Sequence, residues 1–414
     1  MKQITAILLG AGQRGAEVYA AYALNFPNEL KIVGVAEPRE DRRNAFQKLH
    51  QISEENCVAD WEELMNRPKM ADCVIIATQD NMHFLPYKIA AEKGYHILCE
   101  KPMSSDKNEL QEMARAAQNS KQIISICHVL RYSPFFSEIK KLLEEKAIGE
   151  LVSIQHIESV GYWHMAHSFV RGNWNNKGKS SSMILQKCCH DMDILLWLAG
   201  ADCEKVSSFG SLALFKKENT PENAPEYCMD GCMHRDSCPY YAPRFYLEHP
   251  KAVFDGFTKV VSMDASREGL LNALQKGAYG RCVYHCDNDV VDHQVVNLEF
   301  ANGVTANFTM CAFTEKCERV INLMGTKGQI LGNMEENTIE IRDFVTGHHT
   351  NIELQIPAGG HSGSDESMMR EFVALIAGGG KNQNRNSAVT AAQSHLIALA
   401  AEESRLRGGE SLKP

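Results

Sequence analysis

Three glycines near the start of the chain have the spacing of a phosphate-binding turn. Gly10, Gly12 and Gly15 form the pattern G-x-G-x-x-G between an apolar, branched segment and an alanine-rich one. In a dinucleotide site such glycines allow a tight bend, close approach of the backbone to a pyrophosphate, and close packing of helix on strand. The next helix would offer free N–H groups to the phosphates. A glycine-rich turn that binds nothing is the alternative.

An acidic residue stands where a dinucleotide site needs one. Glu37 follows a second apolar segment, residues 30–36, about 20 residues after the glycines. A carboxylate at that place binds the adenosine ribose hydroxyls and repels a 2′-phosphate, so it favours NAD over NADP. Arg39, Arg42 and Arg43 follow and would weaken that preference, unless they form a solvated helix face.

Strand and helix patterns alternate over the first part of the chain. Apolar runs predict strands at 4–9, 30–36, 71–77, 95–99 and 122–127, with helices at 41–49, 61–66, 84–93 and 107–119 between them. This order predicts a parallel sheet whose ligands bind at the carboxyl ends of the strands. The residues expected there to contact a cofactor are Gly10, Gly12, Gln13, Arg14, Gly15, Glu37, Thr78, Asn81, His83, Glu100 and Lys101.

Antiparallel features replace the alternation after residue 127. Strands are expected at 151–159 and from 294 to 354, where Ala301-Asn302-Gly303 marks a hairpin, and helices at 137–145, 183–198, 366–377 and 387–407. We therefore predict an α/β protein in two domains. Residues 1–127 form a doubly wound Rossmann domain. Residues 128–414 form an α+β domain with an open, mainly antiparallel sheet and a cysteine-rich insert at about 213–290.

The composition is that of an ordinary globular protein. Of the 414 residues, 44% are hydrophobic and 23% charged, and the net charge is -9. The negative charge argues against nucleic acid or an anionic membrane as a partner. A strand stands where a signal peptide would, and no apolar run has the length of a membrane span. These features predict a cytoplasmic protein.

The motifs together carry a family resemblance. The GAGQRG turn, the TQDNMH loop, Glu100-Lys101-Pro102 and the CHDMDILLWLAG stretch around His190 resemble the Gfo/Idh/MocA oxidoreductases, and the likeness extends through GTKGQI into the helical tail. The resemblance implies hydride transfer between NAD(P) and a hydroxyl or carbonyl group of a sugar or cyclitol. It also implies a homodimer or homotetramer that associates through the second sheet.

The resemblance places Lys101 in the active site and makes His190 the second catalytic group. Many family members have an aspartate four positions before this histidine, where this chain has Gln186 followed by Lys187. On a continuous helix Lys187 and His190 would share a face. The base that takes a hydroxyl proton is therefore open between Lys101, His190 and Lys187.

An aromatic and histidine-rich segment is the expected sugar-binding loop. Residues 162–174 read YWHMAHSFVRGNW, and aromatic faces with polar tips suit a sugar ring. A loop that packs into the core is the alternative. The substrate candidates are Arg131, Tyr132, Trp163, His164, Trp174 and Asp191, of which Asp191 would equally serve as a charge at a helix N-terminus.

Part of the cysteine content has the look of a metal site. Most of the 14 cysteines stand singly in apolar segments, as small buried thiols do. Cys228, Cys232, Cys238 and the later Cys286 supply the four thiolates that a structural zinc needs, or alternatively an iron–sulfur cluster. Cys282 or His234 would replace one ligand. Free reduced thiols are the other interpretation.

Three functions fit these features. The first is an NAD-dependent dehydrogenase of a sugar, sugar derivative or cyclitol. The second is a glycoside-cleaving enzyme that oxidises a ring hydroxyl, eliminates the leaving group and recycles its NAD, with Lys187, His164 or His167 as the additional base. The third is a cofactor-bound sensor without turnover, which would need neither Lys101 nor His190. The dehydrogenase requires the fewest assumptions.

Overall fold

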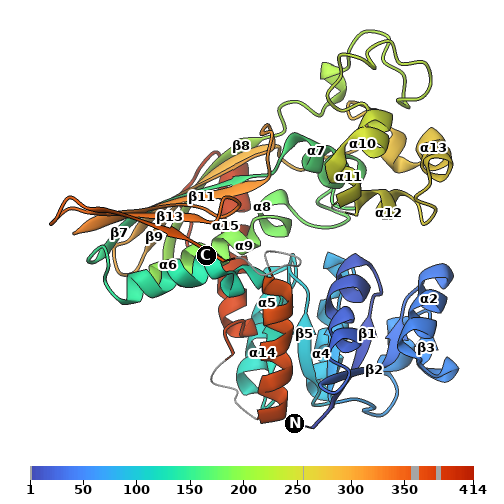
Figure 1. Ribbon diagram of the computed structural model, residues 1–414, viewed down its shortest axis with the longest axis horizontal. Coiled ribbons are helices and arrows are strands. Elements are labelled where there is room, and N and C mark those ends of the chain that lie inside the picture. The colour runs from blue at the N-terminus through green and yellow to red at the C-terminus, as the bar shows by residue number, and fades with distance from the viewer. Residues whose placement is uncertain (1, 255, 356–362, 379–383) are drawn as a thin grey trace.

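The chain is built around two β-sheets that lie side by side (Figure 1). The structure, a computed structural model, describes residues 2–254, 256–355, 363–378 and 384–414. One sheet belongs to the N-terminal part, and the other to the C-terminal part. The predicted fold class, a Rossmann sheet followed by an open and mainly antiparallel sheet, is confirmed.

The first sheet has six strands in the order β3-β2-β1-β4-β5-β6, and every neighbouring pair is parallel. Its central strands are almost continuous apolar runs, because helices cover both faces of such a sheet. The expected strands are present, and only the two-residue edge strand β3 was not predicted. The strands are β1 (Ile4–Leu9), β2 (Leu30–Ala36), β3 (Cys57–Val58), β4 (Cys73–Ile76), β5 (His96–Cys99) and β6 (Ile124–Ile126).

Two of the helices between these strands begin at an aspartate whose side chain caps the first turn. Asp106, for example, accepts the N–H groups of Asn108 and Glu109 at 2.7 and 3.0 Å, and so starts the helix that follows β5. The glycine turn leads into a π-helical segment, η1 (Gln13–Tyr19), and then α1 (Ala21–Asn25). The others are α2 (Glu40–His50), α3 (Trp61–Met65), α4 (Phe84–Glu92) and α5 (Lys107–Asn119).

The second sheet has eight strands in the order β14-β13-β12-β11-β7-β10-β9-β8. Its pairs are antiparallel except for β7 with β10. Residues alternate between buried and less buried along β9, because one face packs on helices such as α6 (Pro134–Glu144). The strands are β7 (Leu151–Ser159), β8 (Cys203–Ser211), β9 (His293–Phe300), β10 (Thr305–Cys311), β11 (Glu318–Gly325), β12 (Gly328–Asn333), β13 (Thr338–Asp343) and β14 (His349–Glu353).

The helix expected at 183–198 is broken in two. It forms α8 (Met183–Gln186) and α9 (Cys189–Ala199), with Lys187 and Cys188 between them. The expectation that Lys187 and His190 share one helix face is therefore wrong. The break frees the carbonyl group of Gln186 for a contact outside the helix, described below.

The tail returns to the first sheet. In α14 (Ser364–Gly378), Met368, Met369 and Phe372 join the core that contains Leu8 of β1. The next helix, α15 (Ala388–Leu406), contributes Ala391 to the core on the opposite face and then continues along the second sheet. The two tail helices lie alongside the first sheet in Figure 1. The last residues of the chain thus tie both sheets together.

The insert folds as a small helical unit above the first sheet (Figure 1). It contains α10 (Ala242–Glu248), α11 (Pro250–Phe254), α12 (Phe257–Val261) and α13 (Arg267–Lys276). One of its links to the aromatic segment is the ring of His167, which stacks on Phe257 at 4.0 Å and Tyr279 at 4.8 Å and shares a 2.7 Å hydrogen bond with the Tyr246 hydroxyl. Aromatic packing therefore holds the insert in place.

Across the described ranges, no helix combines the length and apolar character that crossing a membrane would take.

Two buried histidines predict acid sensitivity. Burial lowers the pKa of His167 and of His395 to about 3, so both rings are neutral when folded. Below a pH of about 6.5 the unfolded chain binds protons that the folded chain does not. Stability should thus be fully present above pH 6.5 and fall as the pH drops towards 3, by up to about 1.4 kcal/mol per pH unit for each ring.

Urea unfolding at pH 7, 6 and 5 measures this effect. The stability advantage of the wild type over His167→Gln should shrink with each step down in pH. The exposed ring of His348 provides the control, because His348→Gln should follow the wild type throughout. A constant difference between wild type and His167→Gln at all three pH values would contradict the assignment.

Candidate functional site

At one glycine of the turn there is space for an added Cβ atom, and at the other two there is none. Gly10 has a φ of +91°, and a Cβ there would lie 2.5 Å from the oxygen of Ala77. A Cβ on Gly15 would lie 2.0 Å from the oxygen of Gly10. At Gly12 an added Cβ would meet only the Arg42 Nη1, at 4.0 Å. Packing therefore requires the outer two glycines, while the space beside Gly12 remains free for a phosphate group.

Glu37 holds this turn against the end of β2. Its carboxylate is 5% exposed and accepts the N–H groups of Ala11 at 2.8 Å and Arg39 at 3.0 Å. Two of the three arginines that follow have local partners. The Arg39 side chain pairs with Asp41, and Arg43 donates to the Glu37 carbonyl oxygen at 2.7 Å. The carboxyl ends of the strands of the first sheet form one edge of that sheet, called the rim from here on. Glu37 thus lies at the rim, where the sequence predicts a contact with the cofactor ribose.

Arg14 and Glu100 form an ion pair across the rim. The Arg14 Nε lies 2.9 Å from Glu100, and its Nη2 lies 2.7 Å from Asp365 of α14. Burial alone would raise the pKa of Glu100, but Arg14, Lys101 and the Tyr19 hydroxyl outweigh it and lower that pKa. Both predicted cofactor contacts are therefore charged groups with fixed partners, and Arg14 also fastens the tail helix to the glycine turn.

The loop after β4 is held from two sides. The buried His83 ring lies 2.7 Å from the Pro102 oxygen and 3.1 Å from the Thr78 oxygen, so it joins this loop to the turn after β5. Asn81 stays exposed on the short turn η3 (Asp80–Met82). Asp80, which the sequence did not single out, accepts the hydroxyl of Ser180 at 2.7 Å and so brings the segment before α8 onto the rim.

Lys101, which follows β5 of the first sheet, contacts helix α8. Its Nζ donates to the main-chain oxygen of Gln186 at 2.8 Å, and the Lys101–Pro102 peptide bond is cis. Gln186 stands where the family resemblance leads one to expect an aspartate. Contact with Lys101 at this place is therefore made by the main chain, through the carbonyl group that the helix break leaves free.

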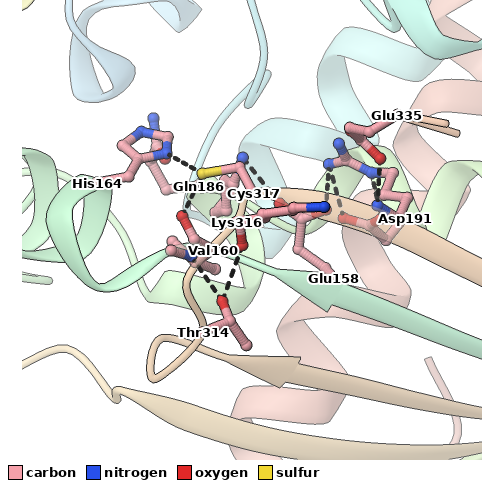
Figure 2. A network of polar contacts seen from close by, with 12 residues as sticks. Glu158, Val160, His164, Gln186, Asp191, Thr314, Lys316, Cys317 and Glu335 are labelled. Carbon is pink, nitrogen blue, oxygen red and sulfur yellow. Dashed lines mark hydrogen bonds and ion pairs between the residues drawn. The ribbon is translucent and has the colours of Figure 1, made fainter. Parts of the chain in front are cut away.

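Lys187 is held as a cation beside this contact. Its Nζ lies 2.9 Å from Glu158, near the end of β7. Glu158 is labelled in Figure 2. Burial would lower the pKa of Lys187, but the Glu158 carboxylate outweighs burial and raises it. At neutral pH Lys187 is thus a hydrogen-bond donor and a positive charge, which suits the stabilisation of a developing alkoxide. Sequence reasoning missed Glu158 because it lies in an unremarkable strand pattern.

A buried ionic network continues from Glu158. Arg319 of β11 lies 2.8 Å from both Glu158 and Asp191, and the His156 Nε2 lies 2.8 Å from Asp191. Burial would raise the pKa of Asp191, but Arg319 and His156 outweigh it and hold that pKa well below its usual range. Asp191 was expected to contact substrate. The structure instead engages its carboxylate beneath the rim.

His190 lies on α9 at the level of the rim. Its ring is 8% exposed and stands edge-on to His128, which follows β6, with 5.5 Å between ring centres. The next two substrate candidates are engaged elsewhere. Arg131 makes two 2.7 Å hydrogen bonds to Asp193, and the Tyr132 hydroxyl donates to Glu371 of α14 at 2.8 Å.

The aromatic segment, residues 162–174, contributes two tryptophans to packing and His164 to the candidate site. Trp163 is 5% exposed and donates from its Nε1 to the Glu315 oxygen at 3.1 Å, and Trp174 packs on Phe169. The His164 Nδ1 lies 3.7 Å from the sulfur of Cys317 (Figure 2). The pKa of His164 is held well below its ordinary value, mainly by burial and next by the nearby positive charge of Lys187. His164 is therefore a neutral imidazole near the two lysines.

The cysteines of the insert do not form the predicted metal site. Within the part of the chain that the structure describes, no three His, Cys, Asp or Glu side chains are placed to hold a metal ion. The zinc or iron–sulfur site expected at Cys228, Cys232, Cys238 and Cys286 is thus unsupported. Two thiols have other contacts, since the Arg171 Nη2 lies 3.8 Å from Cys228 and the Cys286 thiol donates to the Cys282 oxygen.

Comparison with known proteins identifies the family. The NAD-binding Rossmann domain of the Gfo/Idh/MocA oxidoreductase family matches residues 4–128, and the C-terminal alpha/beta domain of that family matches residues 140–401. These two matches span most of the chain. The protein belongs to this family and is an NAD(P)-dependent oxidoreductase.

Individual relatives are distant. The chain is 24% identical to YteT of Bacillus subtilis (strain 168), described as an oxidoreductase, over 75% of this chain and 74% of YteT. It is 27% identical to 2,7-anhydro-N-acetylneuraminate hydratase of Escherichia coli (strain K12), over 49% of this chain and about half, 51%, of that enzyme. A levoglucosan dehydrogenase structure, in complex with NADH and L-sorbose, has a TM-score of 0.73 at 20% identity and covers 100% of this chain and 99% of its own.

Two glycine variants separate cofactor binding from folding. Gly12→Ala places a methyl group in the open space, so NAD should bind at least about tenfold more weakly while stability changes by less than about 1 kcal/mol. Gly15→Ala forces a clash with the Gly10 oxygen and should cost about 3 kcal/mol of stability. Calorimetric NAD titration and urea unfolding measure the two effects. Unchanged NAD affinity in Gly12→Ala would contradict the placement of the phosphate.

Glu158→Gln tests the buried network. Loss of this carboxylate leaves Lys187 without its ion-pair partner and leaves the buried Arg319 with Asp191 and Glu335. It should reduce the free energy of unfolding by about 3–5 kcal/mol. The matched control is Glu299→Gln, which breaks the exposed pair with Lys205 at 3.0 Å and should cost less than about 1 kcal/mol. Equal losses in the two variants, measured by urea unfolding, would show that the network is solvated.

Proposed function

We propose that this protein transfers a hydride between NAD and a secondary hydroxyl or carbonyl group of a sugar, sugar derivative or cyclitol. The observation that carries the proposal is the meeting of Lys101, Lys187 and the neutral His164 at the carboxyl end of β5, on the rim that also holds the glycine turn. Ligands of doubly wound sheets bind at this rim. The levoglucosan dehydrogenase of similar fold, in complex with NADH, supports the substrate class.

The residues present fit a bound dinucleotide. The free space beside Gly12 accepts a phosphate group, and the Glu37 carboxylate at the end of β2 suits ribose hydroxyl groups and favours NAD over NADP. When bound, NAD supplies the carbon that accepts or donates the hydride. Glu100, kept ionised by Arg14, adds a fixed charge on the same rim.

The protonation state of each side chain decides its proposed role in the reaction. Lys187 is protonated, so it acts as the donor that stabilises negative charge on the substrate oxygen. A protonated Lys187 cannot take the hydroxyl proton. The base is therefore Lys101, which contacts the Gln186 oxygen, or His190 of α9, which lies beside His128.

Redox-neutral cleavage is the second candidate function. After oxidation of a ring hydroxyl, elimination needs a further base for the proton on the neighbouring carbon. The imidazole of His164, near Lys187, is unprotonated and can accept that proton, and its lowered pKa makes it a weak base. The likeness to a 2,7-anhydro-N-acetylneuraminate hydratase supports this second candidate. A homodimer or homotetramer, a cytoplasmic location and the division at residue 127 stay predictions.

Absorbance at 340 nm tests the proposal. Purified protein is mixed with a panel of sugars, inositols and glycosides, with and without added NAD. NADH should accumulate in proportion to substrate, and Lys101→Met should lower kcat at least about 100-fold because it removes a group that contacts the reacting oxygen. Lys107→Met, at the exposed start of α5, is the matched control and should keep full activity.

Two outcomes would contradict the proposed dehydrogenase activity or the role of Lys101 in it. Release of the leaving group of a glycoside without net NADH would assign redox-neutral cleavage instead. Equal activity in the Lys101→Met and Lys107→Met variants would remove Lys101 from the site.

A further inference from the structure

A second cavity lies between the insert and the loop after β4. It has a volume of about 560 Å³, and Gln79, residues 170–173 and residues 286 and 287 are among its lining. None of Lys101, Lys187 and His190 lines it. Gln79 brings it to the rim of the first sheet, but the cavity is separate from the group of side chains described above.

Cations outnumber carboxylates in this cavity. Arg171, Lys179 and Arg281 line it, and Asp287 is its one lining carboxylate among the residues that the structure describes. Asp287 is shared, since it lies 3.0 Å from Lys179 and 3.3 Å from Arg281. A further carboxylate, Glu226, lies 3.8 Å from Arg281 without lining the cavity. The lining alone therefore carries an excess of positive charge.

Arg171 is the most unusual of the three cations. It is 5% exposed, and its guanidinium contacts the oxygens of Arg281 at 2.7 Å and Tyr240 at 2.6 Å, and the sulfur of Cys228. No carboxylate pairs with it in the described part of the chain, and its Nη1 makes no hydrogen bond there. A buried charge without a counter-charge is costly unless a ligand supplies one.

The same cavity contains a second unused donor. The Arg281 Nε is buried and has no hydrogen-bond partner among the described residues. The side-chain amides of Asn173 and Asn175 add further polar groups to the lining. Guanidinium groups bind carboxylates and phosphates through paired N–H donors. An excess of donors over acceptors therefore indicates an anionic ligand.

We propose that this cavity, the basic pocket, binds the carboxylate or phosphate group of a small anionic ligand other than the cofactor. Arg171 and Arg281 are the fixed donors of the basic pocket. Lys179, whose side chain is 65% exposed, lies at its mouth. Asp287 competes with the ligand for Lys179 and Arg281.

Calorimetric titration of the full-length, cofactor-free protein tests the proposal. The probes are inorganic phosphate and D-glucuronate, with D-glucose as the neutral control and sodium chloride at matched ionic strength as the salt control. At least one of the two anions should bind saturably, and neither control should. The measurement needs no turnover, so it stands even where the proposed dehydrogenase activity fails.

Three variants make the test specific. Lys179→Gln should weaken anion binding at least about threefold, and Asp287→Asn should tighten it by a similar factor, because the first removes a cation and the second removes its competitor. Lys177→Gln, an equal charge change in the same exposed loop outside the lining, should leave affinity unchanged. Equal effects of Lys179→Gln and Lys177→Gln would overturn the proposal, as would no saturable binding of either anion by the wild type.

Competition then assigns the source of the anion. Binding of the anion that the wild type takes up should persist with NAD saturating, and its loss would overturn the proposal by giving the basic pocket to the cofactor. With a turned-over sugar in hand, phosphate that raises KM without changing kcat supports an anionic group on the substrate. Phosphate that binds together with that sugar supports a separate anionic ligand.

Discussion

Two buried cations and two buried carboxylates set the geometry of the site. Glu158, Arg319 and Asp191 are buried and Lys187 is largely so, with 18% of its side chain exposed, and each would be destabilising without its partner. Their pairing fixes β7, β11 and the start of α9 relative to one another. It also keeps Lys187 protonated, which decides what that side chain can do to a substrate. The chemistry proposed for the rim therefore depends on electrostatics beneath it.

The rim is complete only because three distant parts of the chain meet there. Lys101 reaches the Gln186 oxygen of the second sheet's helices, and Arg14 reaches Asp365 of the tail. Asp80 holds Ser180 from the segment before α8. Each contact joins the first sheet to residues far along the chain. Hydride transfer requires cofactor and substrate to be held close together, and such links hold the two parts of the chain in place for the proposed reaction.

The parts predictable from sequence are those governed by local patterns. Buried parallel strands appear as continuous apolar runs, and a capped amphipathic helix such as α5 is visible from Asp106 onwards. The glycine turn is recognisable because sterics at Gly10 and Gly15 admit no other residue. The pairing of Glu158 with Lys187 could not be predicted, because it joins residues from different elements. The cysteine spacing misled for the same reason, since sequence spacing does not show which side chains a thiol meets in the fold, as Cys228 meets Arg171.

The transfer of deuterium tests the central claim most directly. A substrate identified by turnover or by cleavage is labelled with deuterium on the ring carbon to be oxidised and mixed with equimolar enzyme and NAD for a single turnover. Mass spectrometry of the recovered cofactor then shows where the label went. The account predicts deuterium on the nicotinamide at early times, whether the net reaction is oxidation or redox-neutral cleavage. Product formation with a cofactor that never carries the label would contradict hydride transfer at this rim.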